Sequence, residues 1–202
     1  MTASHVDQKI KHPSYDETLQ QAVKQWQDQQ RTGNTDLWLF GYASLIWKQE
    51  FTFIERRAAR VHGWHRALHM WSTINRGSPE CPGLVFALLS GGSCHGVVFR
   101  IPAARAEQAL KDLWFREMPG DVYEPRWLNC KTEQAIVPAL AFTLPRTNPS
   151  FCGVLSPAQH RQIFSQASGR YGTTLDYAQR TYDSLLAEGI HDRALEKILQ
   201  LK

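Results

Sequence analysis

A turn of small residues directly after an apolar run is the first segment that could do chemistry. Residues 37–40 read as a buried strand, and the turn that follows it consists of Gly41, Tyr42, Ala43, Ser44 and Leu45. Small residues let the backbone approach a ligand closely, and successive N–H groups in such a turn can form a concave nest that binds a carboxylate. The turn is therefore a candidate binding loop, with an ordinary strand-to-loop exit as the alternative.

A carboxylate on an apolar helical stripe is the second candidate. The helix expected from Pro102 to residue 117 or 118 places Glu117 on the same face as Leu110, Leu113 and Trp114. Burying an ionised carboxylate is costly, so the side chain must find a partner, lie at a cleft or hold a proton through a raised pKa. Such a group is suited to proton transfer near neutral pH. A salt bridge from Glu117 to Arg116 or Arg126 is the alternative.

The remaining residue clusters in the sequence do not predict a functional site. His62, His65 and His69 are close in sequence, but on a strand these spacings place side chains on both faces, so no metal site is predicted. The glycine-rich segment 91–96 lacks the pattern of a phosphate-binding loop and reads as a hairpin turn. The sequence has no GxSxG elbow and no cysteine in a nucleophile signature, so acyl-enzyme chemistry has no candidate residue.

The elements that must position these residues follow from hydrophobic periodicity. A helix is expected over residues 15–30, ended by Gly33 and Asn34. Short apolar segments separated by Gly, Pro and Ser then predict strands at 50–54, 60–71, 83–89, 96–101, 122–130 and 135–143. A strand-rich middle flanked by helices predicts an α+β fold whose mixed or antiparallel sheet can close into a barrel.

After residue 144 the pattern becomes helical again. Ser156 reads as the N-cap of a helix, with Gln159 completing a capping box and Gly169 as the expected stop. Two more helices are expected, one that opens at Thr173 or Thr174 and is closed by Gly189, and one over residues 192–201.

Composition and charge narrow the class of protein. The chain has 202 residues, 43% of them hydrophobic, which suits one folded soluble domain. Its net charge of +4 is spread among acidic residues, so nucleic-acid binding is not expected. The cysteines have no CxxC spacing, which predicts reduced thiols and a cytoplasmic protein. No segment reads as a secretory signal, and the most apolar stretch, 136–144, is far shorter than the roughly 20 residues that span a bilayer.

Several motifs occur in a characteristic order between residues 37 and 190. They are Phe40-Gly41-Tyr42-Ala43-Ser44-Leu45-Ile46-Trp47, Trp71-Ser72-Thr73 with Arg76-Gly77, Pro82-Gly83-Leu84, Phe115-Arg116-Glu117, and Thr174, Asp176 and Tyr177. Together they resemble the ChaC family of glutathione-specific gamma-glutamylcyclotransferases. The resemblance implies a gamma-glutamylcyclotransferase-like fold, a small mixed β-barrel flanked by helices. It also implies a reaction without a metal or other cofactor, in which glutathione is cleaved to 5-oxoproline and cysteinylglycine.

The same resemblance assigns roles to individual residues. Glu117 matches the family's catalytic glutamate, the general acid/base for attack of the glutamyl α-amine on its own γ-carbonyl. The residues that match the family's substrate-binding segment are Leu39, Phe40, Gly41, Tyr42, Ala43 and Ser44. Backbone N–H groups of this segment would hold the glutamyl α-carboxylate, Tyr42 would wall or hydrogen-bond the glutamyl unit, and Ser44 would add a donor. Glutathione is the expected partner, and a monomer is favoured.

Two positions depart from the family's pattern. The family often has Gly at the position of Ala43, so if the turn needs a positive φ there, the Cβ costs around 1 kcal/mol. Some members carry a second acidic residue where this chain has Gln108, so no second catalytic carboxylate is carried over.

Two other functions stay open. A cyclotransferase for another γ-glutamyl compound would differ only in the pocket for the leaving portion, which the sequence does not identify. A non-enzymatic regulator of a membrane cation transporter is the alternative from another class, and the carboxylate on an apolar helix face argues against it. The expected organisation is an N-terminal helical extension over residues 1–35 and a gamma-glutamylcyclotransferase-like domain over residues 36–202.

Overall fold

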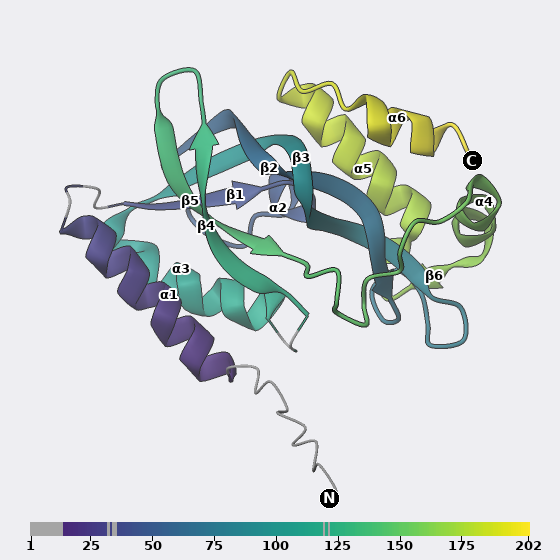
Figure 1. Cartoon of the computed structure of the whole chain (residues 1–202), viewed down its shortest axis with the longest axis horizontal. Coiled ribbons are helices and arrows are strands. Elements are labelled where there is room, and N and C mark those ends of the chain that lie inside the picture. Colours follow the sequence, from purple (N-terminus) through teal and green to yellow (C-terminus); the bar gives the residue numbers. More distant parts are fainter. Residues whose placement is uncertain (1–13, 32, 34–35, 119, 121) are drawn as a thin grey trace, which may run out of the picture.

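A closed five-stranded barrel forms the centre of the protein (Figure 1). The structure, a computed structural model, describes residues 14–31, 33, 36–118, 120 and 122–202. The strands are β1 (Leu37–Gly41), β2 (Glu55–Ser72), β3 (Gly83–Ile101), β4 (Glu124–Lys131) and β5 (Ile136–Thr143). They follow the order β1-β3-β2-β4-β5, with β1 parallel to β5 and the other neighbours antiparallel. The predicted α+β fold with a small mixed barrel is confirmed.

Two long strands, β2 and β3, pair along nearly their whole length. The hairpin turn predicted at 91–96 is therefore wrong, and the strands predicted at 83–89 and 96–101 are one strand. The glycines with positive φ in this region are Gly63 (80°), Gly91 (97°) and Gly92 (71°). Because the pairing register shifts between His62 and Trp64, these glycines form a bulge that bends the ribbon rather than reversing the chain.

The strand predicted at 50–54 is also wrong, because residues 48–54 form an irregular segment. Its two aromatic residues, Phe51 and Phe53, pack edge-on against Phe99 of β3, with ring centroids 5.5 and 5.1 Å away. The apolar alternation that suggested a strand comes from burying two aromatic rings beneath a loop.

The helices lie close to their predicted positions and are α1 (Tyr15–Gln30), α3 (Ala103–Glu117), α4 (Pro157–Gln166), α5 (Thr174–Ala187) and α6 (Arg193–Leu199). The capping box of Ser156 and Gln159 is present at the start of α4. That helix ends before Gly169, which lies in the two-residue strand β6 (Ser168–Gly169) paired with β7 (Gly172–Thr173). The sequence did not predict the short helix α2 (Ser44–Trp47). Gly33 follows α1 with a positive φ, and Asn34 lies outside the described residues.

None of the described helices is long and apolar enough to cross a membrane.

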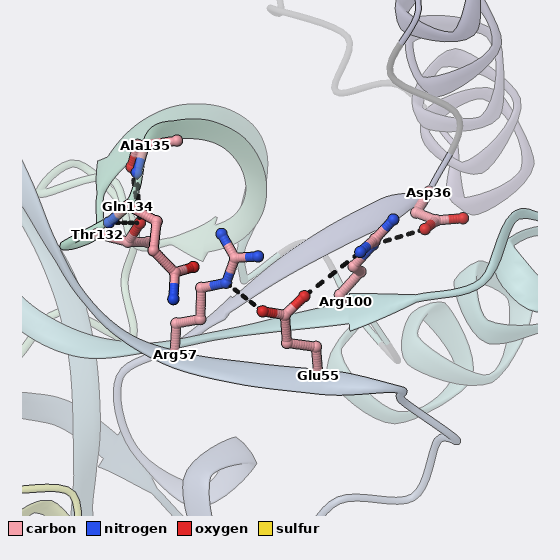
Figure 2. Close-up of polar contacts among 7 residues, drawn as sticks. All are labelled: Asp36, Glu55, Arg57, Arg100, Thr132, Gln134 and Ala135. Atoms are coloured by element: carbon pink, nitrogen blue, oxygen red, sulfur yellow. Dashed lines mark hydrogen bonds and ion pairs between the residues drawn. The ribbon is translucent and has the colours of Figure 1, made fainter.

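A polar contact anchors the start of α3, the helix that carries Glu117. Oδ1 of Asp36 accepts a hydrogen bond from the backbone N–H of Ala103 at 3.0 Å, and its Oδ2 lies 2.6 Å from Nε of Arg100. Figure 2 shows this chain of contacts continuing from Arg100 to Glu55. Because Pro102 at the N-cap position offers no side-chain acceptor, a carboxylate from just before β1 serves as the cap.

The apolar face of α3 packs between the barrel and α1, on the side of the barrel away from α4, α5 and α6 (Figure 1). Leu110 and Trp114 are fully buried there, and Nε1 of Trp114 donates to Oγ1 of Thr18 on α1 at 3.0 Å. This packing leaves α3 little freedom to rotate, so the direction of Glu117 in its last turn is set by the apolar stripe that precedes it.

Candidate active site

A small pocket lies where the turn after β1 meets the last turn of α3. Its empty volume, including the space at its open mouth, is about 300 Å³. It is lined by Tyr42, Ala43, Ser44, Leu45, Phe86, Glu117, Tyr123, Phe142 and Tyr177. The pocket therefore brings together the two features that the sequence identified separately, the small-residue turn and the carboxylate on the helix.

The shape of the turn depends on Gly41 at the end of β1. A Cβ on Gly41 would lie 3.1 Å from the ring of Phe99 and 3.2 Å from Cβ of Leu45, closer than side chains normally pack. The chain can thus enter α2 at once, with the N–H of Ile46 donating to the carbonyl of Ala43 at 2.9 Å. The first N–H groups of a helix have no acceptor within the helix, so those of the turn can serve a ligand.

Ala43 does not need the conformation in which a Cβ is penalised. Its φ is −147°, and the described residues with positive φ are all glycines. The free-energy cost that a Cβ carries at a positive φ therefore does not apply to Ala43.

Glu117 lies at the pocket with 16% of its side chain exposed. Burial raises the pKa of its carboxyl, and the charge and hydrogen bond of Arg116 oppose that rise without cancelling it. The salt bridge considered as an alternative is present, because Nε of Arg116 lies 2.9 Å from Oε1 of Glu117. Arg126 instead pairs with Glu124 at 2.7 Å. The carboxylate is thus paired and still has a higher proton affinity than an ordinary glutamate.

Arg116 also ties the end of α3 to the turn. Its Nη1 donates to the carbonyl of Lys48 at 2.6 Å and to Glu50 at 3.1 Å, and its Nη2 donates to Oγ of Ser44 at 3.2 Å. Since the Ser44 oxygen accepts from Arg116, the hydroxyl proton of Ser44 remains available for an acceptor in the pocket. One guanidinium therefore sets the spacing between the carboxylate and the binding loop.

Three tyrosines complete the wall around Glu117, the buried Tyr42 and Tyr177 and the partly buried Tyr123. Burial raises the pKa of each hydroxyl, and the charge of Glu117 raises it further, so all three stay neutral near pH 7. The hydroxyl of Tyr42 donates to the carbonyl of Phe142 at 3.0 Å, and that of Tyr177 accepts from the N–H of Phe86 at 3.4 Å. These bonds hold the rings in place as walls of the pocket.

The predicted binding segment divides into two parts. Tyr42, Ala43 and Ser44 line the pocket, whereas Leu39, Phe40 and Gly41 lie in β1 and outside the lining. The role of these three residues in binding stays a prediction. Gln108 is exposed on α3 and donates to Asp112 at 2.9 Å, outside the pocket lining.

Sequence reasoning left three pocket residues unassigned: Phe86, Tyr123 and Phe142. They come from separate elements, and no local pattern marks them as neighbours of Glu117. A signal was available only for Tyr177, which belongs to the terminal motif of the family resemblance.

His62, His65 and His69, the histidines close together in sequence, belong to no metal centre in the part of the chain that the structure describes. Nδ1 of His65 lies 2.8 Å from the carbonyl of Gly91, a contact within the barrel wall. Among the described residues, no group of three or more His, Cys, Asp or Glu side chains is arranged to hold a metal ion. The absence of a metal or cofactor from the reaction stays a prediction.

Comparisons with known proteins agree with this arrangement of fold and pocket. The family model described as ChaC-like protein matches residues 37–201. The glutathione-specific gamma-glutamylcyclotransferase of Escherichia coli (strain K12) is 32% identical over 164 residues, covering 81% of this chain and 71% of that protein. The glutathione-specific gamma-glutamylcyclotransferase 1 of Rattus norvegicus is 34% identical over 173 residues, covering 81% and 77%.

A crystal structure of the yeast gamma-glutamylcyclotransferase specific to glutathione has the same fold. Its TM-score is 0.73 at 20% identity, over 83% of this chain and 96% of that one. Sequence, fold and the matched motifs thus lead to one conclusion: this chain belongs to the ChaC family.

Proposed function

We propose that this protein is a glutathione-specific gamma-glutamylcyclotransferase that cleaves glutathione to 5-oxoproline and cysteinylglycine. The names of its relatives support this substrate. One observation carries the proposal: a buried carboxyl with a raised pKa, Glu117, faces the same small pocket as the turn that opens α2. The first N–H groups of a helix have no acceptor within the helix. A ring closure within the γ-glutamyl unit needs a proton acceptor and an anchor for the α-carboxylate.

The reaction requires two protons to pass from the glutamyl nitrogen to the cysteine nitrogen. The α-amine of the glutamyl unit has a reference pKa near 8 and is protonated at neutral pH, so Glu117 accepts a proton before the amine attacks. A bond forms between the amine nitrogen and the γ-carbonyl carbon, which closes the five-membered ring. Glu117 returns its proton to the cysteine nitrogen as the bond from that carbon to this nitrogen breaks. The ring nitrogen then loses its remaining extra proton, which the released amine takes up, so that the products are a neutral lactam and an ammonium group.

The turn supplies the anchor in this proposal. The N–H groups of Ala43, Ser44 and Leu45 and the hydroxyl of Ser44 bind the α-carboxylate, while β1, with Leu39, Phe40 and Gly41, supports the turn from below. Tyr42 acts as a wall, because its hydroxyl already donates to Phe142. Since the nucleophile and electrophile belong to one molecule, holding the folded conformer supplies much of the rate enhancement.

The proposal also covers the compartment, the domain organisation and the partners of the protein. The four cysteines are free thiols, which supports a reducing compartment and thus the cytoplasm. We also propose that residues 1–35 are an N-terminal helical extension of the ChaC domain, 36–202; within it, the described helix α1 contacts α3. The proposed protein works without a metal, cofactor or nucleic acid, with monomer as the favoured state.

A substrate comparison tests the proposal. Purified protein is incubated in parallel with reduced glutathione, γ-glutamylalanine and γ-glutamyllysine, before and after dialysis against EDTA, and 5-oxoproline is quantified by mass spectrometry. We expect product from glutathione alone and no effect of EDTA. Product chiefly from another compound would favour a cyclotransferase of different specificity. A folded protein that forms no product would favour the role of a cation-transport regulator.

A further inference from the structure

A buried arginine links the C-terminal helix to the backbone of the active-site turn. Arg66 of β2 has only 3% of its side chain exposed. Its Nη1 donates to the carbonyl of Tyr42 at 2.7 Å and to the carbonyl of His95 at 3.1 Å. On its other side, Nε donates to Oδ2 of Asp192 at 3.1 Å, and Nη2 donates to the same oxygen. The Arg66 guanidinium is thus fixed between one carboxylate and two backbone carbonyls.

Asp192 is itself held by the start of α6. Its Oδ1 accepts hydrogen bonds from the N–H groups of Ala194 and Leu195, both at 3.0 Å. One oxygen of Asp192 therefore caps the helix and the other orients Arg66. A buried guanidinium without such a partner would be strongly unfavourable, so the position of Arg66 depends on Asp192.

Because Arg66 fixes the direction of the Tyr42 carbonyl, it also fixes the direction of the next N–H, which belongs to Ala43. A trans peptide is planar, and its N–H points opposite to its carbonyl. With the carbonyl of Tyr42 directed at Arg66, the N–H of Ala43 is directed to the other side of the peptide plane. Tyr42, Ala43 and Ser44 line the pocket on the turn. Donation from Arg66 to the carbonyl also polarises the amide, which strengthens its N–H as a donor.

We propose that Arg66 and Asp192 are positioning residues that aim the N–H of Ala43 at the α-carboxylate of the γ-glutamyl substrate. This inference rests on the proposed function, since it concerns the same site. It makes α6, near the end of the chain, a determinant of substrate binding although it lies outside the pocket lining. In this proposal Arg66 and Asp192 do not touch the substrate, and they act on it only through the Tyr42–Ala43 peptide.

If Arg66 and Asp192 had a purely structural role, their replacement would affect stability but not substrate binding in particular. The chain offers a matched control for this comparison. Nη2 of Arg56, also on β2, pairs at 3.0 Å with Glu188, which follows α5. Arg56 and Arg66 thus both tie β2 to the C-terminal helices, but only Arg66 also contacts the turn. Loss of the Arg56 pair should affect stability alone.

The test compares ligands with and without the α-carboxylate. Asp192→Asn keeps an oxygen to cap α6 and removes the charge that orients Arg66, while Arg66→Lys keeps the charge and removes the fork of donors. Each variant, with Arg56→Gln as the control, is assayed below its melting temperature. The quantities measured are kcat and KM for glutathione and the inhibition constant of γ-aminobutyryl-cysteinylglycine, which is glutathione without its α-carboxylate.

We expect Asp192→Asn and Arg66→Lys to raise KM for glutathione about tenfold, with a smaller change in kcat, because the carboxylate is bound in both ground and transition states. The inhibition constant of the analogue should stay within about twofold, and Arg56→Gln should match the wild type. Equal weakening of both ligands, or unchanged KM in both folded variants, would overturn the inference. An inactive wild-type protein would instead contradict the proposed function itself.

Discussion

Nε of Arg116 lies 2.9 Å from Oε1 of Glu117, so the carboxylate of the pocket is paired with its immediate neighbour in the chain. The same guanidinium donates to Ser44 of the turn at 3.2 Å. Burial nevertheless outweighs the nearby cation, and the pKa of Glu117 stays above its ordinary value. The carboxyl of Glu117 thus takes part in an ion pair and still binds a proton more readily than an ordinary glutamate does.

Replacing Glu117 by Gln tests the proposed acid/base directly. The amide keeps the shape of the side chain but cannot accept a proton, so we expect turnover of glutathione to fall by about 10²- to 10⁴-fold with the fold retained. Turnover is measured as 5-oxoproline release and the fold by circular dichroism. Glu50→Gln is the matched control, because Glu50 also bonds Arg116 but is half exposed and outside the pocket lining. Near-native activity of Glu117→Gln would remove Glu117 from its role.

The pH profile should report the raised pKa of Glu117. A general base must be deprotonated, so kcat/KM should fall on acidification through a pKa above the usual 4.5 of a glutamate. Arg116 lowers this pKa, so Arg116→Gln should move the acid limb to higher pH, and Arg116→Lys should move it less. The measurement is the pH profile of kcat/KM for the wild type, Arg116→Gln and Arg116→Lys. An acid limb that stays in place in Arg116→Gln would show that another group controls it.

Two substitutions of Tyr42 separate a wall from a hydrogen-bond donor. The hydroxyl of Tyr42 is already used by the carbonyl of Phe142. Tyr42→Phe should therefore leave KM within about threefold and lower stability by about 1 kcal/mol, whereas Tyr42→Ala should raise KM at least tenfold through loss of the wall. Steady-state kinetics and urea unfolding measure both effects. If Tyr42→Phe weakened binding as much as Tyr42→Ala, the hydroxyl would have to contact the substrate.

The cap on α3 predicts an effect on stability. Asp36 is the acceptor for the N–H of Ala103 at the start of this helix (Figure 2 shows its pairing with Arg100). Asp36→Ala should lower the free energy of unfolding by about 1 kcal/mol, seen as a shift of the urea midpoint with an unchanged slope. Glu55→Gln changes the other end of the same network, which does not contact the N–H of Ala103, and should have little effect on α3. Equal midpoints for Asp36→Ala and the wild type would show that Asp36 does not stabilise α3.

Much of the local structure could be predicted from the sequence. The bounds of α1, the capping box of Ser156 and Gln159, and the apolar stripe that leads to Glu117 all matched the structure. These features depend on residues within one or two helical turns of each other, which is the range over which helix periodicity and capping act. The family resemblance added the fold and marked Glu117 and the turn.

The strands of the barrel were harder to predict than the helices, because glycines occur in two kinds of backbone feature. Gly91 and Gly92 fit a chain reversal as well as a bulge, and the choice depends on the pairing of β3 with β2. Phe51 and Phe53 alternate as they would on a strand, yet they cover Phe99 from a loop. In both cases the deciding partner lies far away in the sequence.

The sequence by itself determined the helices α1, α3, α4, α5 and α6, the acidic residue at the end of α3 and the small-residue turn, because short-range patterns encode each of them. Only the tertiary structure decided that Tyr123 and Tyr177 enclose Glu117, and that Arg66 reaches both Tyr42 and Asp192, 126 residues further along the chain. Such contacts arise where the barrel strands come together and α6 packs against α5. They depend on the summed packing of the whole chain, which no local pattern encodes.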